Sequence, residues 1–317
     1  MLRLLGSLCA RGWEVTLTTP GPGPLQEQGL AAGLRWHPLA VGALRRGGGA
    51  PALGSWPLVR SLARDAGVVY LNGAVCGRLL PALGAGTRRV LHIHDMVRRV
   101  PRMWRRADVV LTDSHAAAAR LSGLDPHVVY CPVDPDPPAA AAPWPTGNGP
   151  VVGFVGRIEP RKGPLDLVRA AAAIRRGAPD ARIVVVGEDP YGGDPDYTRA
   201  VTSSPEIEHH PWSENAPGLM RHLDVLVLPS YEEPFGTVLA EAMAVGTPVV
   251  ASAVDGLPEV VRDGVTGALV APGDPAGLAA GVLRVLAARE QMGAAAREHA
   301  RRFFLEPYAE QVQELIA

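Results

Sequence analysis

Two glutamates in the second half of the chain stand on either side of a Pro-Phe-Gly turn. In EEPFGTVLAEAMAVGTPVVAS, residues 232–252, Glu233 comes before the turn and Glu241 after it, within a run of good helix formers. On one continuous helix this spacing would separate the carboxylates by ~12 Å along the axis. The turn instead predicts Glu233 in a loop before a helix and Glu241 about one turn inside it, so both can reach one ligand.

The start of that predicted helix suits a diphosphate. The amides of Phe235, Gly236, Thr237 and Val238 would point out of the helix start, where the helix dipole favours an anion. The glycine lets the ligand approach the backbone closely. Carboxylates on both sides would accept hydrogen bonds from hydroxyls. The stretch therefore predicts a site for a nucleotide-sugar, with its sugar, diphosphate and ribose.

A second stretch, GFVGRIEPRKGPLDLV from Gly153, is predicted to run from strand through loop to helix. Its loop carries Arg157 and Lys162, and Lys162 is the single lysine beside thirty arginines. Ligands of open parallel sheets bind at the carboxyl ends of strands, and two cations there suit a leaving diphosphate. The alternative is that these cations and glutamates are ordinary surface residues.

The loop after Gly153 does not fit the two common phosphate-binding fingerprints. It lacks the spacing of Gly-x4-Gly-Lys-Ser/Thr and of Gly-x-Gly-x-x-Gly. The second absence argues against a dehydrogenase.

Short runs rich in Val, Ile and Leu alternate with Ala-rich segments of helix length, which is typical of β-α-β units and parallel sheets. We predict an α/β fold with two Rossmann-like, doubly wound parallel-sheet domains facing a cleft. The predicted strands are Trp13–Thr19, Gly67–Leu71, Arg89–His94, Asp108–Thr112, Val128–Cys131, Val151–Val155, Arg182–Val186, Asp224–Leu228, Pro248–Ala251 and Ala268–Val270.

Proline and glycine crowd the stretch DPDPPAAAAPWPTGNGP between the halves. Such a density continues neither a helix nor a central strand, so it predicts a linker. The expected division is an N-terminal acceptor-side domain over 1–137, a linker over 138–150 and a nucleotide-sugar domain over 151–300. A C-terminal helix over 301–317, broken near Glu306 by Pro307, is expected to cross back to the first domain.

The composition indicates a cytoplasmic protein. No apolar run of the 317 residues reaches the ~18 that a membrane-spanning helix needs. The N-terminal MLRLLGSLCARGWEV is predicted to begin a helix, since it lacks a small-residue cleavage site. Cys9, Cys76 and Cys131 are too few and too scattered for a disulfide framework or a metal cluster.

Charge is divided unevenly between the halves. Residues 1–149 hold 16 arginines against 9 acidic residues, whereas the remainder is acidic on balance. Seven arginines fall between Arg88 and Arg106. This region is a solvated surface or, alternatively, a basic surface for an anionic acceptor or for peripheral membrane contact.

Three stretches together carry a family resemblance: GFVGRIEPRKG, VLVLPSYEEPFGTVLAEAMAVGTPVVAS and DGLPEVVRDGVTGALVAPGD. Their order and spacing resemble glycosyltransferase family 4, retaining enzymes of the GT-B fold. In the first half, VLHIHDM and ADVVLTDSHAAAARL resemble strands of the same family. The resemblance covers most of residues 107–300.

The resemblance implies a role for each matching residue. Glu233 would contact hydroxyls of the donor sugar, and Glu241 would hold the ribose. Arg157 and Lys162 would neutralise the leaving diphosphate. The donor-binding amides would be those of Phe235, Gly236, Thr237 and Val238. His94, in VLHIHDM, would face the donor sugar. The alternative is that His94 is a structural histidine, and His92 shares its face of the strand.

The implied reaction is a metal-independent transfer of a sugar, with retention of configuration, from a nucleotide-diphosphate sugar to an acceptor hydroxyl. The acceptor would be a small molecule, a lipid or a glycan. No cofactor, metal or nucleic acid is expected, and Asp134-Pro-Asp136 and Asp194-Pro-Asp196 are predicted to be loops. The alternatives are an inactive GT-B relic that binds nucleotide or a partner, and a sugar-nucleotide epimerase.

The beginning of the chain departs from the family. The sequence LGSLCARGWEVTLTTP matches the helix that normally follows the first strand and its Gly-rich loop, so that strand is expected to be missing. Its neighbours would then lack hydrogen-bond partners. A start codon upstream, an inactive copy, or another segment filling the gap would each explain this. The Gly- and Pro-rich stretch 40–57 is a poor substitute.

Overall fold

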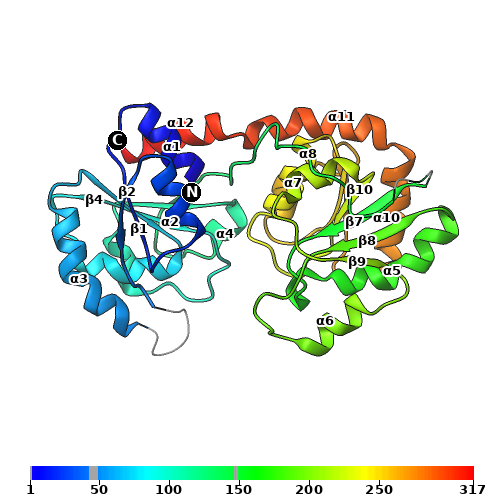
Figure 1. Ribbon diagram of the computed structural model, residues 1–317, viewed down its shortest axis with the longest axis horizontal. Coiled ribbons are helices and arrows are strands. Elements are labelled where there is room, and N and C mark those ends of the chain that lie inside the picture. The colour runs from blue at the N-terminus through cyan, green and yellow to red at the C-terminus, as the bar shows by residue number, and fades with distance from the viewer. Residues whose placement is uncertain (1, 43–48, 146, 148) are drawn as a thin grey trace. The chain divides into compact units, whose positions relative to one another are not determined.

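The computed structural model describes residues 2–42, 49–145, 147 and 149–317. The chain forms two compact units (Figure 1). Unit 1 comprises Met1–Tyr130 and Leu305–Ala317, and unit 2 comprises Cys131–Phe304. Part of the stretch 40–57 lies outside the described residues.

Unit 2 is built on one parallel sheet of six strands in the order β12-β11-β10-β7-β8-β9. The order reverses direction between β7 and β10, which makes their carboxyl ends the switch point where doubly wound sheets bind ligands. The strands are β7 (Val151–Val155), β8 (Arg182–Val186), β9 (Glu208–His210), β10 (Val225–Leu228), β11 (Val249–Ser252) and β12 (Gly267–Val270).

Helices cover this sheet on both faces, so its central strands are buried apolar runs, as a parallel sheet requires. The α-helices are α5 (Pro164–Gly177), α6 (Pro195–Thr202), α7 (Ala216–Leu219), α8 (Thr237–Ala244), α9 (Leu257–Val260), α10 (Pro275–Ala287) and α11 (Arg289–Ala300). Short 3-10 turns are η3 (Pro160–Lys162), η4 (Met220–His222) and η5 (Arg301–Phe303).

Unit 1 divides its strands between two parallel sheets, β1-β2 and β3-β4-β5-β6. The strands are β1 (Thr16–Thr19), β2 (Arg35–Pro38), β3 (Val68–Asn72), β4 (Arg88–Ile93), β5 (Val109–Thr112) and β6 (Pro126–Val128). Within the described residues, β1 pairs only with β2 and β3 only with β4. Among the described residues, no strand joins the two sheets of unit 1.

The helices of unit 1 come from the first 130 residues and from the C-terminal end of the chain. They are α1 (Leu2–Ala10), α2 (Pro24–Ala31), α3 (Ala50–Ala63), α4 (His115–Ala119) and α12 (Leu305–Ile316), with 3-10 turns η1 (Ala74–Ala82) and η2 (Arg102–Arg106). The predicted helix at the N-terminus is therefore present as α1. It packs with α12, where Arg11 Nη1 donates to Gln313 Oε1 at 3.1 Å.

Pro307 does not break a helix, contrary to the prediction. The chain leaves α11 at Ala300, and α12 begins at Leu305, so Pro307 lies in the first turn of α12. A first-turn residue has no helical acceptor for its N–H, so proline is tolerated there.

Most predicted strands are present, and β7 and β8 have the predicted bounds. The predicted strand Val128–Cys131 lies instead at Pro126–Val128. Two strands, β2 and β9, were not predicted. Their sequences, RWHP and EHH, lack the apolar run that identified the others.

Residues of the predicted linker, 138–150, pack on unit 2 where they are described. The carbonyl of Pro138 accepts from Asn215 Nδ2 at 2.8 Å, and the carbonyl of Ala140 lies 2.7 Å from His222 Nε2. Trp144 is buried beside His210, with 5.6 Å between ring centroids. None of the described helices is both long enough and apolar enough to span a bilayer.

Candidate functional site

The loops after β7 and β10 bring the predicted cations and Glu233 together. The two strands are neighbours, with Leu226 opposite Gly153. The loop after β7 ends in η3, which carries Lys162, and the loop after β10 carries Glu233 before α8. Both loops therefore leave the sheet at its switch point.

Lys162 and Glu233 form a direct ion pair between Nζ and Oε2. The two side chains are only 15% and 8% exposed. Burial lowers the pKa of Lys162 from its usual value, and the negative charge of Glu233 acts in the opposite direction. Each charge is costly to bury alone, so each depends on its partner.

The backbone around Glu233 is held from the segment after β11. Its N–H donates to Asp255 Oδ2 at 3.1 Å, and its carbonyl accepts from Gly256 N at 3.1 Å. Asp255 has a positive φ of 43°. A Cβ on Gly256 would lie 2.0 Å from the carbonyl oxygen of Pro234, so glycine is required for this close approach.

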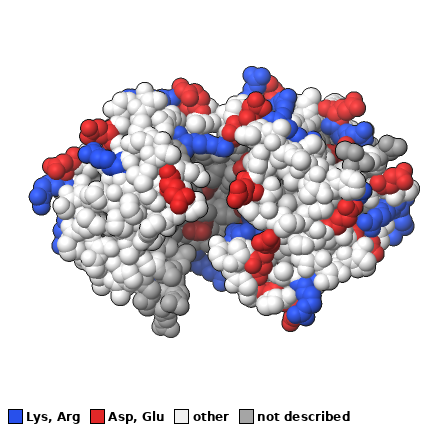
Figure 2. All heavy atoms as spheres, viewed as in Figure 1, with Lys and Arg blue, Asp and Glu red and all other residues white. Residues whose placement is uncertain are grey.

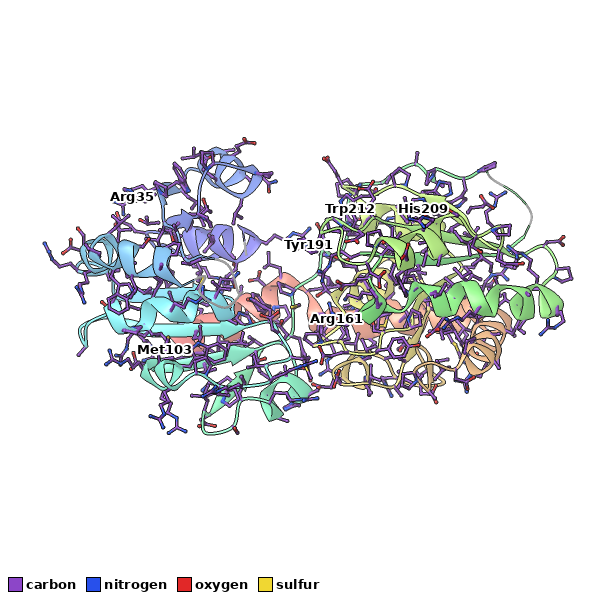
Figure 3. The ribbon with its side chains drawn as sticks, turned by 90° about the horizontal axis from the view of Figure 1, so that it is seen from below. Arg35, Met103, Arg161, Tyr191, His209 and Trp212 are labelled. Atoms are coloured by element: carbon purple, nitrogen blue, oxygen red, sulfur yellow. The ribbon has the colours of Figure 1, made fainter. Side chains whose placement is uncertain are left out.

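The two loops are also fastened to each other through Arg161 (Figure 3). Its guanidinium donates to the carbonyl of Glu232 at 2.8 Å, and its own carbonyl accepts from Tyr231 N at 2.8 Å. Gly163 has a φ of 69°, and a Cβ there would lie 2.1 Å from the carbonyl oxygen of Pro229. These contacts fix where Lys162 meets Glu233.

Arg157 lies in the same loop but contacts other groups. Its Nη2 is 3.4 Å from Glu159 Oε1, and its guanidinium lies 5.7 Å from the ring centroid of Tyr191. Tyr191 is 76% exposed on the loop after β8 (Figure 3). The structure thus places Arg157 beside the loop that follows β8.

The predicted turn and helix are present at α8. Gly236 is its N-cap, in the left-handed conformation with φ 85°, and α8 begins at Thr237. The ring of Phe235 is buried against Phe303, with centroids 5.3 Å apart. Glu241 is half-buried at the fifth position of α8.

His94 belongs to unit 1, where it follows β4. Its Nδ1 lies 2.8 Å from Asp113 Oδ2, and its Nε2 lies 2.8 Å from Asn72 Oδ1. His92 is 1% exposed and lies between Tyr70 Oη and Asp113 Oδ1, at 2.6 and 2.9 Å. Of the two histidines, His92 is therefore the buried structural one, and His94 has the accessible side chain, 34% exposed.

Asp113 joins the two histidines. Burial alone would raise the pKa of its carboxyl, but the hydrogen bonds from His92 and His94 lower it to about 2. These three side chains form the one group of metal-ligand type found among the described residues, with ligand atoms within 4.8 Å of one another. Each facing ring nitrogen is already at hydrogen-bond distance from the carboxylate.

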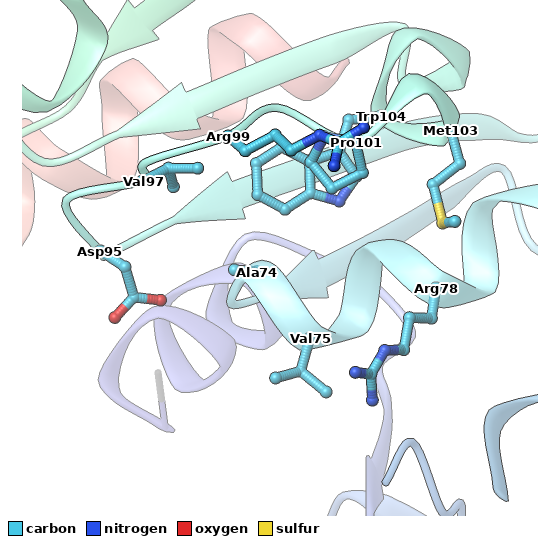
Figure 4. Close-up of a pocket in the computed structure, with 9 residues that line it drawn as sticks. All are labelled: Ala74, Val75, Arg78, Asp95, Val97, Arg99, Pro101, Met103 and Trp104. Atoms are coloured by element: carbon cyan, nitrogen blue, oxygen red, sulfur yellow. The ribbon is translucent and has the colours of Figure 1, made fainter. Parts of the chain in front are cut away.

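Unit 1 also has a pocket of about 410 Å³ after β4 (Figure 4). Arg78 on η1 and Arg99 supply positive charge, and Asp95 supplies a carboxylate. The remaining lining is largely apolar and comes from Ala74, Val75, Val97, Pro101, Met103 and Trp104.

The arginine-rich region from Arg88 to Arg106 is partly engaged inside unit 1. Arg88 Nη2 donates to the carbonyl of Leu315 at 3.0 Å, and Arg89 Nη2 lies 2.6 Å from Asp108 Oδ1. On the face of unit 2 seen in Figure 2, basic and acidic side chains are interspersed.

Asp134-Pro-Asp136 is a loop, as predicted, but the prediction of a loop at Asp194-Pro-Asp196 is wrong in part, because Pro195 and Asp196 begin α6. Both stretches use their carboxylates locally. Asp136 pairs with Arg221 at 2.7 Å, and Asp134 accepts from the N–H of Asp136 at 3.0 Å. Asp194 caps α6, and Asp196 pairs with Arg199 at 3.1 Å.

Two family models match successive parts of the chain. The model of "Glycosyltransferase Family 4" matches residues 1–137, and that of "Glycosyl transferases group 1" matches residues 149–288. The chain belongs to glycosyltransferase family 4. The expected α/β fold of the GT-B class is confirmed for this family 4 chain by its parallel sheets and its structural neighbours.

A curated relative of this family 4 chain is the D-inositol 3-phosphate glycosyltransferase of Salinispora arenicola. The two are 41% identical over 171 residues, which is 49% of the chain and 38% of the relative. The chain therefore covers less than two-fifths of that relative's length.

Solved structures resemble the family 4 chain over nearly all its length. HepE of Anabaena, in complex with UDP and glucose, has a TM-score of 0.76 at 21% identity, covering 98% of this chain and 95% of that one. A glycosyltransferase of Rickettsia africae has a TM-score of 0.81 at 17% identity, covering 99% and 92%. At these identities the likeness concerns the fold.

Sequence reasoning missed three residues that shape these sites. Arg161 stood in the quoted EPRKG stretch, and Asp255 in DGLPE, but a residue that positions a backbone has no spacing signature. Asp113 stood in VLTDS directly after a predicted strand. Its position at a strand end, next to the strand of His92 and His94, was the signal that could have found it.

Proposed function

We propose that the protein is a retaining, metal-independent glycosyltransferase that moves a sugar from a nucleotide-diphosphate sugar to an acceptor hydroxyl. The observation that carries the proposal is the buried Lys162–Glu233 pair at the switch point of unit 2. It joins one cation and one carboxylate beside the start of α8, where backbone amides favour an anion.

Each predicted site residue of unit 2 then has a role. Lys162 and Arg157 stabilise the negative charge that grows on the diphosphate as the sugar leaves. Glu233 accepts hydrogen bonds from sugar hydroxyls, and its contact with Lys162 links the sugar subsite to the diphosphate subsite. The α8 amides bind the diphosphate, and Glu241 accepts from the ribose.

In the proposed reaction, the bond between the anomeric carbon and the diphosphate oxygen breaks, and the acceptor oxygen bonds to the same face of that carbon. The acceptor proton passes to the departing phosphate oxygen. Lys162 and Arg157 supply the positive charge that a divalent metal would otherwise contribute. His94 is assigned to the donor sugar, as the family resemblance implies.

The donor and acceptor are proposed from the comparisons. HepE has been solved with UDP and with UDP-glucose, so we propose a UDP-sugar as donor. The curated relatives are named for D-inositol 3-phosphate, so we propose a phosphorylated polyol as acceptor. The pocket with Asp95, Arg78 and Arg99 suits such a molecule, because a carboxylate accepts from hydroxyls and guanidinium groups bind phosphate.

The first test is a thermal-shift panel with UDP, GDP, dTDP and ADP. A nucleotide at ~100 times its dissociation constant should add ~2.7 kcal/mol of stability, or several degrees. UDP release from UDP-glucose with an inositol phosphate, unchanged by EDTA, would then support metal-independent transfer. An anomeric proton of unchanged configuration in the product would support retention.

A second candidate is an inactive relic that binds nucleotide or a partner. The observation that favours it is the separation of β1-β2 from β3-β6 within the described part of unit 1. A UDP-induced shift without transfer to any acceptor and without donor hydrolysis would support the relic.

The predicted cytoplasmic location and peripheral membrane contact remain predictions.

A further inference from the structure

The Asp113 carboxylate contacts His94, the histidine assigned to the donor sugar. β4 and β5 run parallel with Ile93 opposite Thr112, so the next residues, His94 and Asp113, leave the sheet side by side. The carboxylate lies 2.8 and 3.0 Å from His94 Nδ1 through its two oxygens. Asp113 is 3% exposed, so water does not compete for these contacts.

The carboxylate is itself held in place by His92. His92 Nε2 lies 2.9 Å from Asp113 Oδ1, and its Nδ1 lies 2.6 Å from Tyr70 Oη on β3. An ionised carboxylate only accepts, so His92 donates through Nε2–H, and the tyrosine hydroxyl donates to Nδ1. This chain from β3 through β4 to β5 fixes Asp113 without help from solvent.

The two ring nitrogens of His94 have different hydrogen-bond partners. Asp113 can only accept, so it requires a proton on Nδ1. Nε2 lies 2.8 Å from the side-chain amide of Asn72, and an amide can present either its oxygen or its nitrogen. The Nδ1 role is therefore set by the protein, and in this neutral Nδ1–H form Nε2 carries no proton and accepts.

We propose that Asp113 is a positioning residue for sugar transfer, which fixes the ring plane and the Nδ1–H form of His94, so that Nε2 can exchange the Asn72 amide for a substrate hydroxyl. This inference rests on the proposed function, in which His94 contacts the donor sugar. Asp113 itself does not touch the substrate.

The chain offers a matched control for removing the carboxylate. Asp108 immediately precedes the first residue of β5, whereas Asp113 follows its last. Asp108 also binds a cation of β4, with 2.6 Å between its Oδ1 and Arg89 Nη2. Asp108→Asn and Asp113→Asn therefore make the same chemical change at opposite ends of one strand.

In the transfer assay, Asp113→Asn should lower kcat by about 100-fold while the donor KM changes less than threefold. In enzymes whose histidine moves a proton, loss of the carboxylate that orients the histidine lowers kcat about 10⁴-fold. We expect a smaller loss of kcat where the imidazole binds a sugar. Asp108→Asn should keep kcat within twofold of wild type. Equal effects of both substitutions on kcat would overturn the positioning role.

A second readout does not need turnover. Long-range ¹H–¹⁵N NMR of wild type should show a protonated Nδ1 on His94, which Asp113→Asn redistributes and Asp108→Asn leaves in place. An unprotonated Nδ1 in wild type would overturn the inference even if the variants do not fold. Binding of Zn²⁺, added alone at micromolar concentration, to both His92 and His94 would also overturn the inference. No transfer by wild type with the expected NMR pattern would instead reject the proposed function.

Discussion

Each unit buries one carboxylate in the loop that follows a strand of a parallel sheet, but the partners of this carboxylate differ between the two units. In unit 2, Glu233 follows β10 and pairs with Lys162, which comes from the loop after β7. In unit 1, Asp113 follows β5 and accepts hydrogen bonds from His92 and His94 of the neighbouring β4.

The difference reflects what each partner can do. An ammonium group is a compact charge, so the pair in unit 2 is suited to a substrate whose charge changes during reaction. An imidazole has two distinct ring nitrogens, so the carboxylate in unit 1 is suited to fixing an orientation. The first site depends on loops and therefore on glycines and Arg161, whereas the second is set by the register of two strands.

The largest expected effect is at the ion pair of unit 2. Lys162→Met should lower kcat at least 100-fold, because the leaving diphosphate loses a cation. It should also destabilise the protein by about 3 kcal/mol, because Glu233 stays buried without its partner. Transfer assays and urea unfolding measure the two effects.

Two further variants separate charge from packing at this ion pair. The double variant Lys162→Met/Glu233→Gln should recover most of the stability but not the activity. Arg169→Met is the control, because Arg169 also pairs with a carboxylate, Asp166, but is 57% exposed. Full activity in Lys162→Met, or in Glu233→Ala alone, would show that these residues do not serve the donor.

The next effect tests whether the site of unit 2 depends on loop geometry. Gly163→Ala places a Cβ 2.1 Å from the carbonyl oxygen of Pro229 at a φ of 69°. Gly192→Ala has a similar φ, 59°, with nothing within 4 Å. Gly192→Ala should cost ~1 kcal/mol from its backbone conformation, and Gly163→Ala at least ~1 kcal/mol more.

Calorimetric melts of both glycine variants, with and without UDP, measure this difference. Only Gly163→Ala should weaken the shift that UDP produces. Equal melting temperatures would contradict the close approach of the two loops.

Acidification tests the network of unit 1. Burial lowers the pKa of His92 below its usual 6.5. On acidification the imidazole therefore takes up a proton in the unfolded state before it does so in the folded state. The free energy of unfolding falls as the pH drops below about 6.5. The pKa of the Asp113 carboxyl is about 2 in the folded protein, against its usual value of 3.8. The free energy of unfolding therefore falls by a further ~2 kcal/mol as the pH drops from about 4 to 2.

Urea unfolding at a series of pH values measures both steps. Asp113→Asn should already be destabilised at pH 7 and should lack the step between about pH 4 and 2. A variant that keeps this step would show that another carboxyl group causes it.

The smallest effect concerns the surface of unit 1. Of its arginine-rich region, Arg88 and Arg89 are engaged within the unit, so membrane contact would depend on the remaining arginines. Co-sedimentation with vesicles containing anionic lipid should therefore be weak and should disappear at high salt. Binding to neutral vesicles, or binding that persists in salt, would contradict an electrostatic contact.

Local sequence patterns determined a large part of this protein. Buried parallel strands need continuous apolar runs, so β7, β8 and β10 were predictable, and so was the turn from Gly236 into α8. Glu233 and Lys162 were predicted as site residues because loops at strand ends carry ligand-binding groups.

Only the tertiary structure decided which of these residues meet. Glu233 and Lys162 are 71 positions apart, and their contact depends on β7 and β10 being neighbours in a sheet whose order no local pattern encodes. The same holds for Asp113, which lies beside His94 because β4 and β5 pair in one register. Strands β2 and β9, which lack an apolar run, form because a neighbouring edge offers them hydrogen bonds.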